Sequence, residues 1–162
     1  MKWFLSRLLV AETIVAGAFY AIAAAILFAD VVSRELFNDS IWGGQRMAVL
    51  FANASALIGI SVAVALNRHI RPSVFDTVFP ESWSPYVVRL GHVISACVLL
   101  GGAYFAVLLV LDNRSMGFTT PPLDLEIWIP QLALPYGLGM AGLKFLIFAG
   151  FPDLQPNPNE GA

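Results

Sequence analysis

The chain has 162 residues, of which 58% are hydrophobic and 12% are charged, and its net charge is −2. Soluble domains carry about 25% charged residues, so this composition indicates a protein whose solvent is the lipid bilayer. The negative charge argues against nucleic acid as a partner. The one cysteine, Cys97, excludes an internal disulfide and a paired-cysteine metal motif.

Four long apolar stretches follow one another along the chain, and none of them contains Asp, Glu, Lys or Arg. Each approaches the roughly 20 residues that a helix needs to cross a bilayer. The sequence therefore predicts an all-α fold, an integral membrane four-helix bundle over residues 1–151, with a polar, disordered tail over 152–162. With their flanks, the four spans are predicted at about residues 12–34, 43–66, 86–111 and 127–149.

The segment before the first stretch holds two basic residues, Lys2 and Arg7, and places Trp3, Phe4 and Leu8 near one another on a helix. This pattern is typical of a short N-terminal helix in the membrane interface. A plain basic flank of the first span explains it equally well, so both interpretations stay open.

The distribution of positive charge predicts the orientation, because cytoplasmic loops carry more Lys and Arg. An even number of spans puts both termini on one side, and that side holds the larger set, so both termini are predicted to be cytoplasmic. Lys144, near the end of the last span, is expected to extend its stem outward to the interface. The larger set is Lys2, Arg7, Arg68, Arg71, Arg89 and Lys144, and the smaller is Arg34, Arg46 and Arg114.

Small residues recur at every fourth position on three of the spans. In lipid, such stripes let two helix backbones approach closely. They predict packing within this bundle or against another membrane protein, and we assign two of them to subunit packing. Those two stripes are Gly17, Ala21 and Ala25 on the first span and Ala133, Gly137 and Ala141 on the fourth; the third is Ala48, Ala52 and Ala56.

Few polar side chains suggest chemistry. Asp30 and Arg34 stand four residues apart, which predicts a structural ion pair at the outer end of the first span. Glu12 is placed at the membrane border, and a role as the proton site of a small self-contained exporter is one alternative. His69 and His92 raise haem ligation as another alternative. No nucleophile–base pair or metal cluster is visible, so neither an enzyme nor a bound cofactor is predicted.

Three ordered motifs resemble the small membrane subunit, the DctQ-like family, of tripartite ATP-independent periplasmic (TRAP) transporters. The first is Arg34-Glu35-Leu36-Phe37-Asn38 followed by Trp42. The second is the His69-Ile70-Arg71 stretch after the second span. The third is Thr120-Pro121-Pro122-Leu123, then Trp128-Ile129-Pro130 and Pro135. The chain departs from the family pattern where Gly43-Gly44-Gln45-Arg46 replaces an acidic pair after Trp42.

The resemblance implies a subunit of a sodium-driven transporter in the bacterial inner membrane. Its implied partners are a large membrane subunit, which moves an organic acid or similar solute, and a periplasmic solute-binding protein that delivers it. The small subunit is expected to widen the stationary scaffold of the large one, in contact with membrane lipid. Arg34, Arg46 and Arg114 would then meet the binding protein or lipid phosphates on the outer face.

Overall fold

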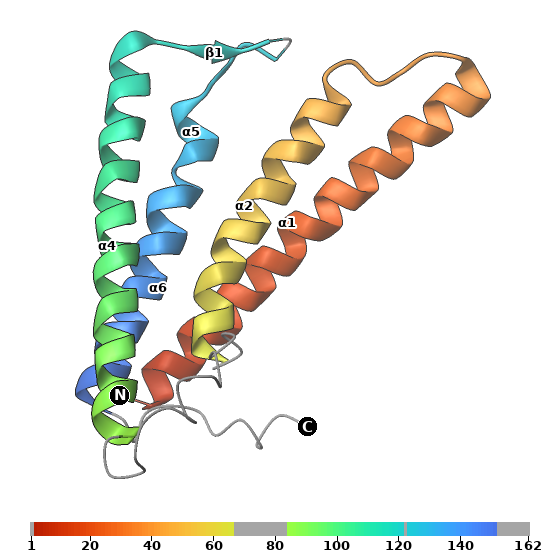
Figure 1. Ribbon diagram of the computed structural model, residues 1–162. Helices are drawn as coiled ribbons and strands as arrows, with labels where there is room; N and C mark the ends of the chain where they lie inside the picture. The colour runs from red at the N-terminus through yellow and green to blue at the C-terminus, as the bar shows by residue number, and fades with distance from the viewer. Residues whose placement is uncertain (1, 67–83, 122, 152–162) are drawn as a thin grey trace.

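A computed structural model describes residues 2–66, 84–121 and 123–151, and these residues fold almost entirely as helix (Figure 1). The apolar stretches explain this, because a backbone within lipid must satisfy its own hydrogen bonds. The helices are α1 (Lys2–Phe37), α2 (Gly44–Ala65), α4 (Ser84–Met116), α5 (Trp128–Gln131) and α6 (Ala133–Gly150). Two short antiparallel strands, β1 (Thr119–Thr120) and β2 (Leu125–Glu126), lie between α4 and α5.

Four helical segments are long and apolar enough to cross a membrane, which confirms the predicted all-α, four-span membrane fold. They are Leu5–Phe37, Gly44–Ala65, Tyr86–Met116 and Trp128–Gly150. The second matches its predicted bounds within a residue, whereas the first and third are longer than predicted. The predicted tail, 152–162, lies outside the described residues.

The first helix continues without a break from Lys2, so the N-terminal segment forms the first turns of α1 and not a separate interfacial helix. At about 1.5 Å per residue, its 36 residues make a rod of roughly 54 Å. This exceeds the roughly 30 Å thickness of the hydrocarbon core, so α1 must tilt or extend past the membrane border.

The fourth span is interrupted at Leu132, between α5 and α6. Pro135, which the sequence predicts to bend this span, stands in the first turn of α6. Its nitrogen carries no proton and cannot donate to the carbonyl group of Gln131, which weakens the helix at this point. Leu132 itself keeps right-handed helical angles, with φ −57° and ψ −24°, so the span continues through the break.

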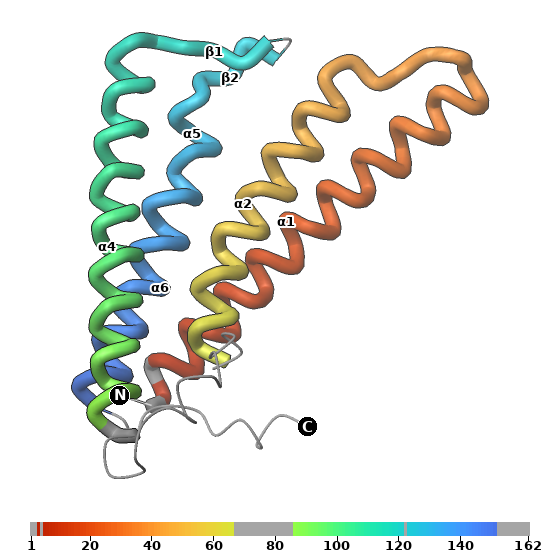
Figure 2. The backbone as a smooth tube through the Cα atoms, viewed as in Figure 1, coloured from red at the N-terminus to blue at the C-terminus, as the bar shows by residue number. Residues whose placement is uncertain are grey.

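The helices form two hairpins, α1 with α2 and α4 with α6, which α2 and α6 join. The hairpins lie together at the end where α1 begins and α6 ends, and they diverge toward the other end (Figures 1 and 2). A buried cluster lies at the joined end, where α2, α4 and α6 meet. Its members are Val64, Ala96, Ala141, Phe145 and Phe148.

Candidate functional site

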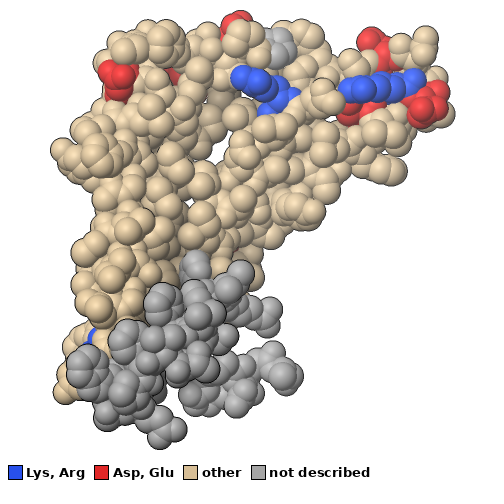
Figure 3. Space-filling view, viewed as in Figure 1, with Lys and Arg blue, Asp and Glu red and all other residues tan. Residues whose placement is uncertain are grey.

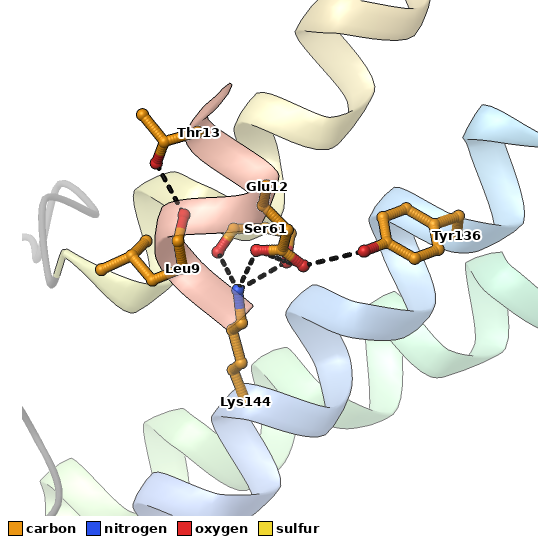
Figure 4. Close-up of polar contacts among 6 residues, drawn as sticks. All are labelled: Leu9, Glu12, Thr13, Ser61, Tyr136 and Lys144. Atoms are coloured by element: carbon orange, nitrogen blue, oxygen red, sulfur yellow. Dashed lines mark hydrogen bonds and ion pairs between the residues drawn. The ribbon is translucent and has the colours of Figure 1, made fainter. Parts of the chain in front are cut away.

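The most deeply buried charged groups of the described residues lie together at the joined end of the two hairpins. Glu12 on α1 and Lys144 on α6 are each 2% exposed, and Ser61 on α2 is fully buried. Tyr136, two turns before Lys144 on α6, points its hydroxyl group at the same carboxylate (Figure 4). We call Glu12, Ser61, Tyr136 and Lys144 the polar cluster.

The hydrogen bonds of the polar cluster satisfy its charged groups completely. The Lys144 ammonium group donates to Glu12 Oε2 at 2.5 Å, to the Ser61 hydroxyl group at 2.8 Å and to the Ser61 carbonyl oxygen at 3.0 Å. Those three bonds use all three of its protons. Ser61 Oγ and the Tyr136 hydroxyl group donate to Glu12 Oε1 at 3.0 and 3.2 Å. Both charged groups of the ion pair therefore have their hydrogen-bond partners within this chain.

The structure corrects one expectation here. Lys144 does not extend its side chain outward, because the side chain is 2% exposed and pairs with Glu12. Helix α1 begins ten residues before the predicted span, so Glu12 lies within the helix and faces Lys144. The paired carboxylate also lacks the open coordination that a proton-coupled exporter would need.

The sequence contains a signal for the polar cluster, although none of the three motifs includes its residues. Glu12 follows the start of the first helix by about three turns, and Lys144 precedes the end of the last by about two. Since these helices run in opposite directions, the two opposite charges stand at similar depths. An ionisable residue inside a span is expected to find a partner.

An apolar groove lies between the two hairpins. Its volume is about 640 Å³, and side chains of α1, α2, α5 and α6 line it. Glu12 and Tyr136 are among these side chains, and Phe19 and Phe51, which pack edge to face with centroids 5.6 Å apart, belong to its α1–α2 wall. Figure 3 shows the molecule hollowed between the hairpins. The groove runs from the polar cluster toward the end where the hairpins diverge.

The two stripes of small residues assigned to subunit packing have different surroundings. Gly137 and Ala141 are buried within this chain, and a Cβ atom at Gly137 would collide with the Leu57 carbonyl group of α2. By contrast, Gly17 and its neighbours on the stripe are exposed, and a Cβ atom at Gly17 would meet nothing within 4 Å. The α6 stripe thus serves packing inside the chain, and the α1 stripe faces outward.

The outer end of the first hairpin brings Asp30 and Arg34 together, at the spacing that predicted their pairing. Arg34 Nη2 donates to Asp30 Oδ2 at 2.5 Å, and the Ile41 amide donates to Asp30 Oδ1 at 2.9 Å. Asp30 is 3% exposed, whereas half of the Arg34 side chain is exposed. The carboxylate therefore ties the loop after α1 back to the helix as well as pairing with arginine.

This geometry predicts unequal effects of two substitutions. Asp30→Ala leaves the Ile41 amide without its acceptor and should cost about 1–3 kcal/mol of stability. Arg34→Ala removes a half-exposed side chain, so water can reach the Asp30 carboxylate in its place, and the change should cost under about 1 kcal/mol. Unfolding of both purified variants by denaturant measures the difference. A larger loss in Arg34→Ala would mean that the arginine, and not the loop contact, stabilises this end.

Acidic and basic side chains gather at the same outer end (Figure 3). Arg46 is exposed near the start of α2. Arg114 stacks on the Trp128 ring, 5.1 Å from its centroid, and the indole group of Trp128 donates to Glu126. This stacking joins the end of α4 to the start of α5.

The structure describes one of the two histidines considered for haem ligation. The His92 ring lies 5.6 Å from the Phe145 ring, and His69 lies outside the described residues, so the structure does not test the pair. Within the described ranges, no group of three or more His, Cys, Asp or Glu side chains is placed to hold a metal ion.

The fold defines a multi-pass membrane protein, and comparison with known families narrows this class. The sequence model for the DctQ component of tripartite ATP-independent periplasmic transporters matches residues 23–149. The match covers most of the chain, so the chain belongs to this family and is a small membrane component of a TRAP transporter. Such components work with a large membrane subunit and a periplasmic binding protein, as the three motifs implied. A search of curated proteins finds no match.

Proposed function

We propose that this chain braces the large membrane subunit of a sodium-driven, binding-protein-dependent transporter for an organic acid or similar solute. It would form part of the stationary scaffold in a bacterial inner membrane, with both termini in the cytoplasm. The observation that carries the proposal is the polar cluster, in which the ammonium protons of Lys144 all have acceptors within the chain. A charge satisfied in this way fixes helices together, whereas ion coupling needs groups that open to an ion.

The outward surface of α1 supports a contact with the large subunit. In the most apolar 18-residue part of the first span, only 11% is buried within the chain. On this helix, the exposed stripe of Gly17, Ala21 and Ala25 runs beside large apolar side chains such as Tyr20 and Phe28. Small residues flanked by large ones form a surface against which a second helix can pack closely.

Reconstitution tests the proposed function directly. Liposomes containing both membrane subunits should take up the solute when its binding protein and an inward sodium gradient are supplied. Liposomes that lack either membrane subunit should show only background uptake. Sodium-driven uptake by this chain alone, or full uptake by the large subunit without it, would contradict the bracing role.

A substitution at Gly17 tests the proposed contact surface. Gly17→Leu should leave the isolated chain folded, because the space around Gly17 is open, but should reduce recovery of the large subunit in copurification. Gly91→Leu on α4 is the matched control, since a side chain there also meets nothing within 4 Å. Normal recovery with Gly17→Leu would show that the α1 stripe faces lipid.

The exposed arginines of the outer face support a second, narrower part of the proposal. Arg34, Arg46 and Arg114 stand at the end of the bundle where the hairpins diverge, which is the periplasmic end in the predicted orientation. Guanidinium groups bind carboxylates and phosphates alike. We assign them to transient contact with the loaded binding protein or to lipid headgroups.

A further inference from the structure

We infer that the polar cluster sets the relative position of the two hairpins and thereby shapes the surface that the small subunit presents to its large partner. The cluster acts through geometry, so Glu12 and Lys144 are positioning residues. The effect on the partner rests on the proposed function, whereas the effect on the hairpins is a property of this chain alone.

The first step concerns what joins the hairpins. Helix α1 packs along α2, and α4 packs along α6, so each hairpin is held by its own helix pair. Between the hairpins, α2 and α6 make the main helix contact. Helix α1 reaches α6 through Glu12, which accepts hydrogen bonds from Lys144 and Tyr136. The polar cluster thus links α1, α2 and α6 at a single depth.

The second step concerns where the cluster lies along the α2–α6 contact. The two backbones approach closely where Gly137 faces Leu57, since even a Cβ atom would not fit there. Ser61 is one turn beyond Leu57 on α2, and Lys144 is two turns beyond Gly137 on α6, both toward the joined end. The groove runs beside this contact. Glu12 and Tyr136 line it near the cluster, and Leu125 and Ile129 line it toward the diverging ends. Along α2 and α6, the close contact therefore lies between Ser61 and Lys144 on one side and the diverging ends on the other.

The third step concerns the forces available in lipid. Lipid tails are as apolar as the side chains that line the groove, so burial from water does not favour one angle between the hairpins. Hydrogen bonds are directional, and an unpaired charge at this depth is costly. An ion pair on one side of a close backbone contact can accordingly fix how far the helices diverge on the other side.

The experiment measures the distance between the diverging ends in the full-length chain. Exposed Cys97 is first replaced by alanine, and spin labels are attached through Gln45→Cys on α2 and Asp112→Cys on α4. The test variant is Glu12→Met with Lys144→Met, which removes both charges and keeps side chains of similar length. Leu143→Met, an exposed neighbour on α6, is the matched control.

The expected result is a shifted and broadened distance distribution in the double variant, and an unchanged one in Leu143→Met. A role limited to stability would change the amount of folded protein and leave the distances of the folded molecules as in the wild type. If the folded double variant shows the same distances between the spin labels as the wild type, the inference is overturned.

A second measurement separates this inference from the proposed function. In the complex, the double variant should reduce both copurification of the large subunit and solute uptake, while the control reduces neither. If the distances shift but assembly and uptake stay normal, the effect on the partner is overturned. If the wild-type chain neither assembles with a large subunit nor supports uptake, the proposed function fails and the distance result still stands.

Discussion

Replacing Gly137 with alanine should greatly reduce the amount of folded protein, although the change adds a single methyl group. The new Cβ atom would overlap the Leu57 carbonyl group of α2, and backbone atoms cannot rotate away as a flexible side chain can. Overpacking in a well-packed interior costs about 1–3 kcal/mol, and a clash with backbone belongs at the upper end of that range. Unfolding of the purified chain in mixed micelles measures the loss.

The matched control for this substitution stands two residues further along α6. At Gly139 an added Cβ atom would come no closer than 3.8 Å to the Cβ atom of Ala103, which is an ordinary contact. Gly139→Ala should be neutral or slightly stabilising, since alanine is favoured over glycine in helices by about 1 kcal/mol. Equal stability of the two variants would show that α2 and α6 do not approach as closely as the structure places them.

Hydropathy alone predicted the membrane spans. An uncharged apolar stretch in a bilayer forms a helix, because a helix satisfies all of its backbone hydrogen bonds within the stretch. The second span shows this best, with α2 at Gly44–Ala65 against a prediction of 43–66. The helix ends were less predictable. Helix α4 continues to Met116, beyond the apolar stretch, because residues such as Asp112 and Arg114 are compatible with a helix once it leaves the hydrocarbon core.

The direction in which each stripe of small residues faces could not be derived from its spacing. The stripes on α1 and α6 have the same four-residue period, yet Gly17 is exposed and Gly137 is buried against α2. Periodicity shows that a face exists, and only the arrangement of the other helices decides what covers it. The motifs, in contrast, indicated the family correctly, because a motif depends on the order of residues along the chain and not on how the helices pack.

The polar cluster was missed for a related reason. Glu12 stands at the border of the predicted first span and Lys144 near the end of the predicted fourth, so neither charge lies within an uncharged stretch. Helix α1 in fact begins at Lys2, and the antiparallel course of α6 brings Lys144 to the same depth. The pair is predictable when opposite charges on different helices are compared by their distance from the same end of the bundle.

Removing one member of the Glu12–Lys144 pair should destabilise the chain more than removing both. Lys144→Met leaves a buried carboxylate without its counter-ion, and Glu12→Met does the same to the ammonium group, so each should cost about 3 kcal/mol or more. In the double variant neither charge remains, and the cost should fall well below the sum of the two single losses.

Unfolding free energies of the wild type, both single variants and the double variant form a cycle that measures the coupling between the two side chains. Strong coupling is expected because both residues are 2% exposed and the three bonds of the ammonium group go to Glu12 and Ser61 within the described chain. Additive losses would mean that water or lipid headgroups reach the two charges and solvate them separately. The cluster would then lack the rigidity needed to position the hairpins, so this cycle also tests a physical requirement of the scaffold role.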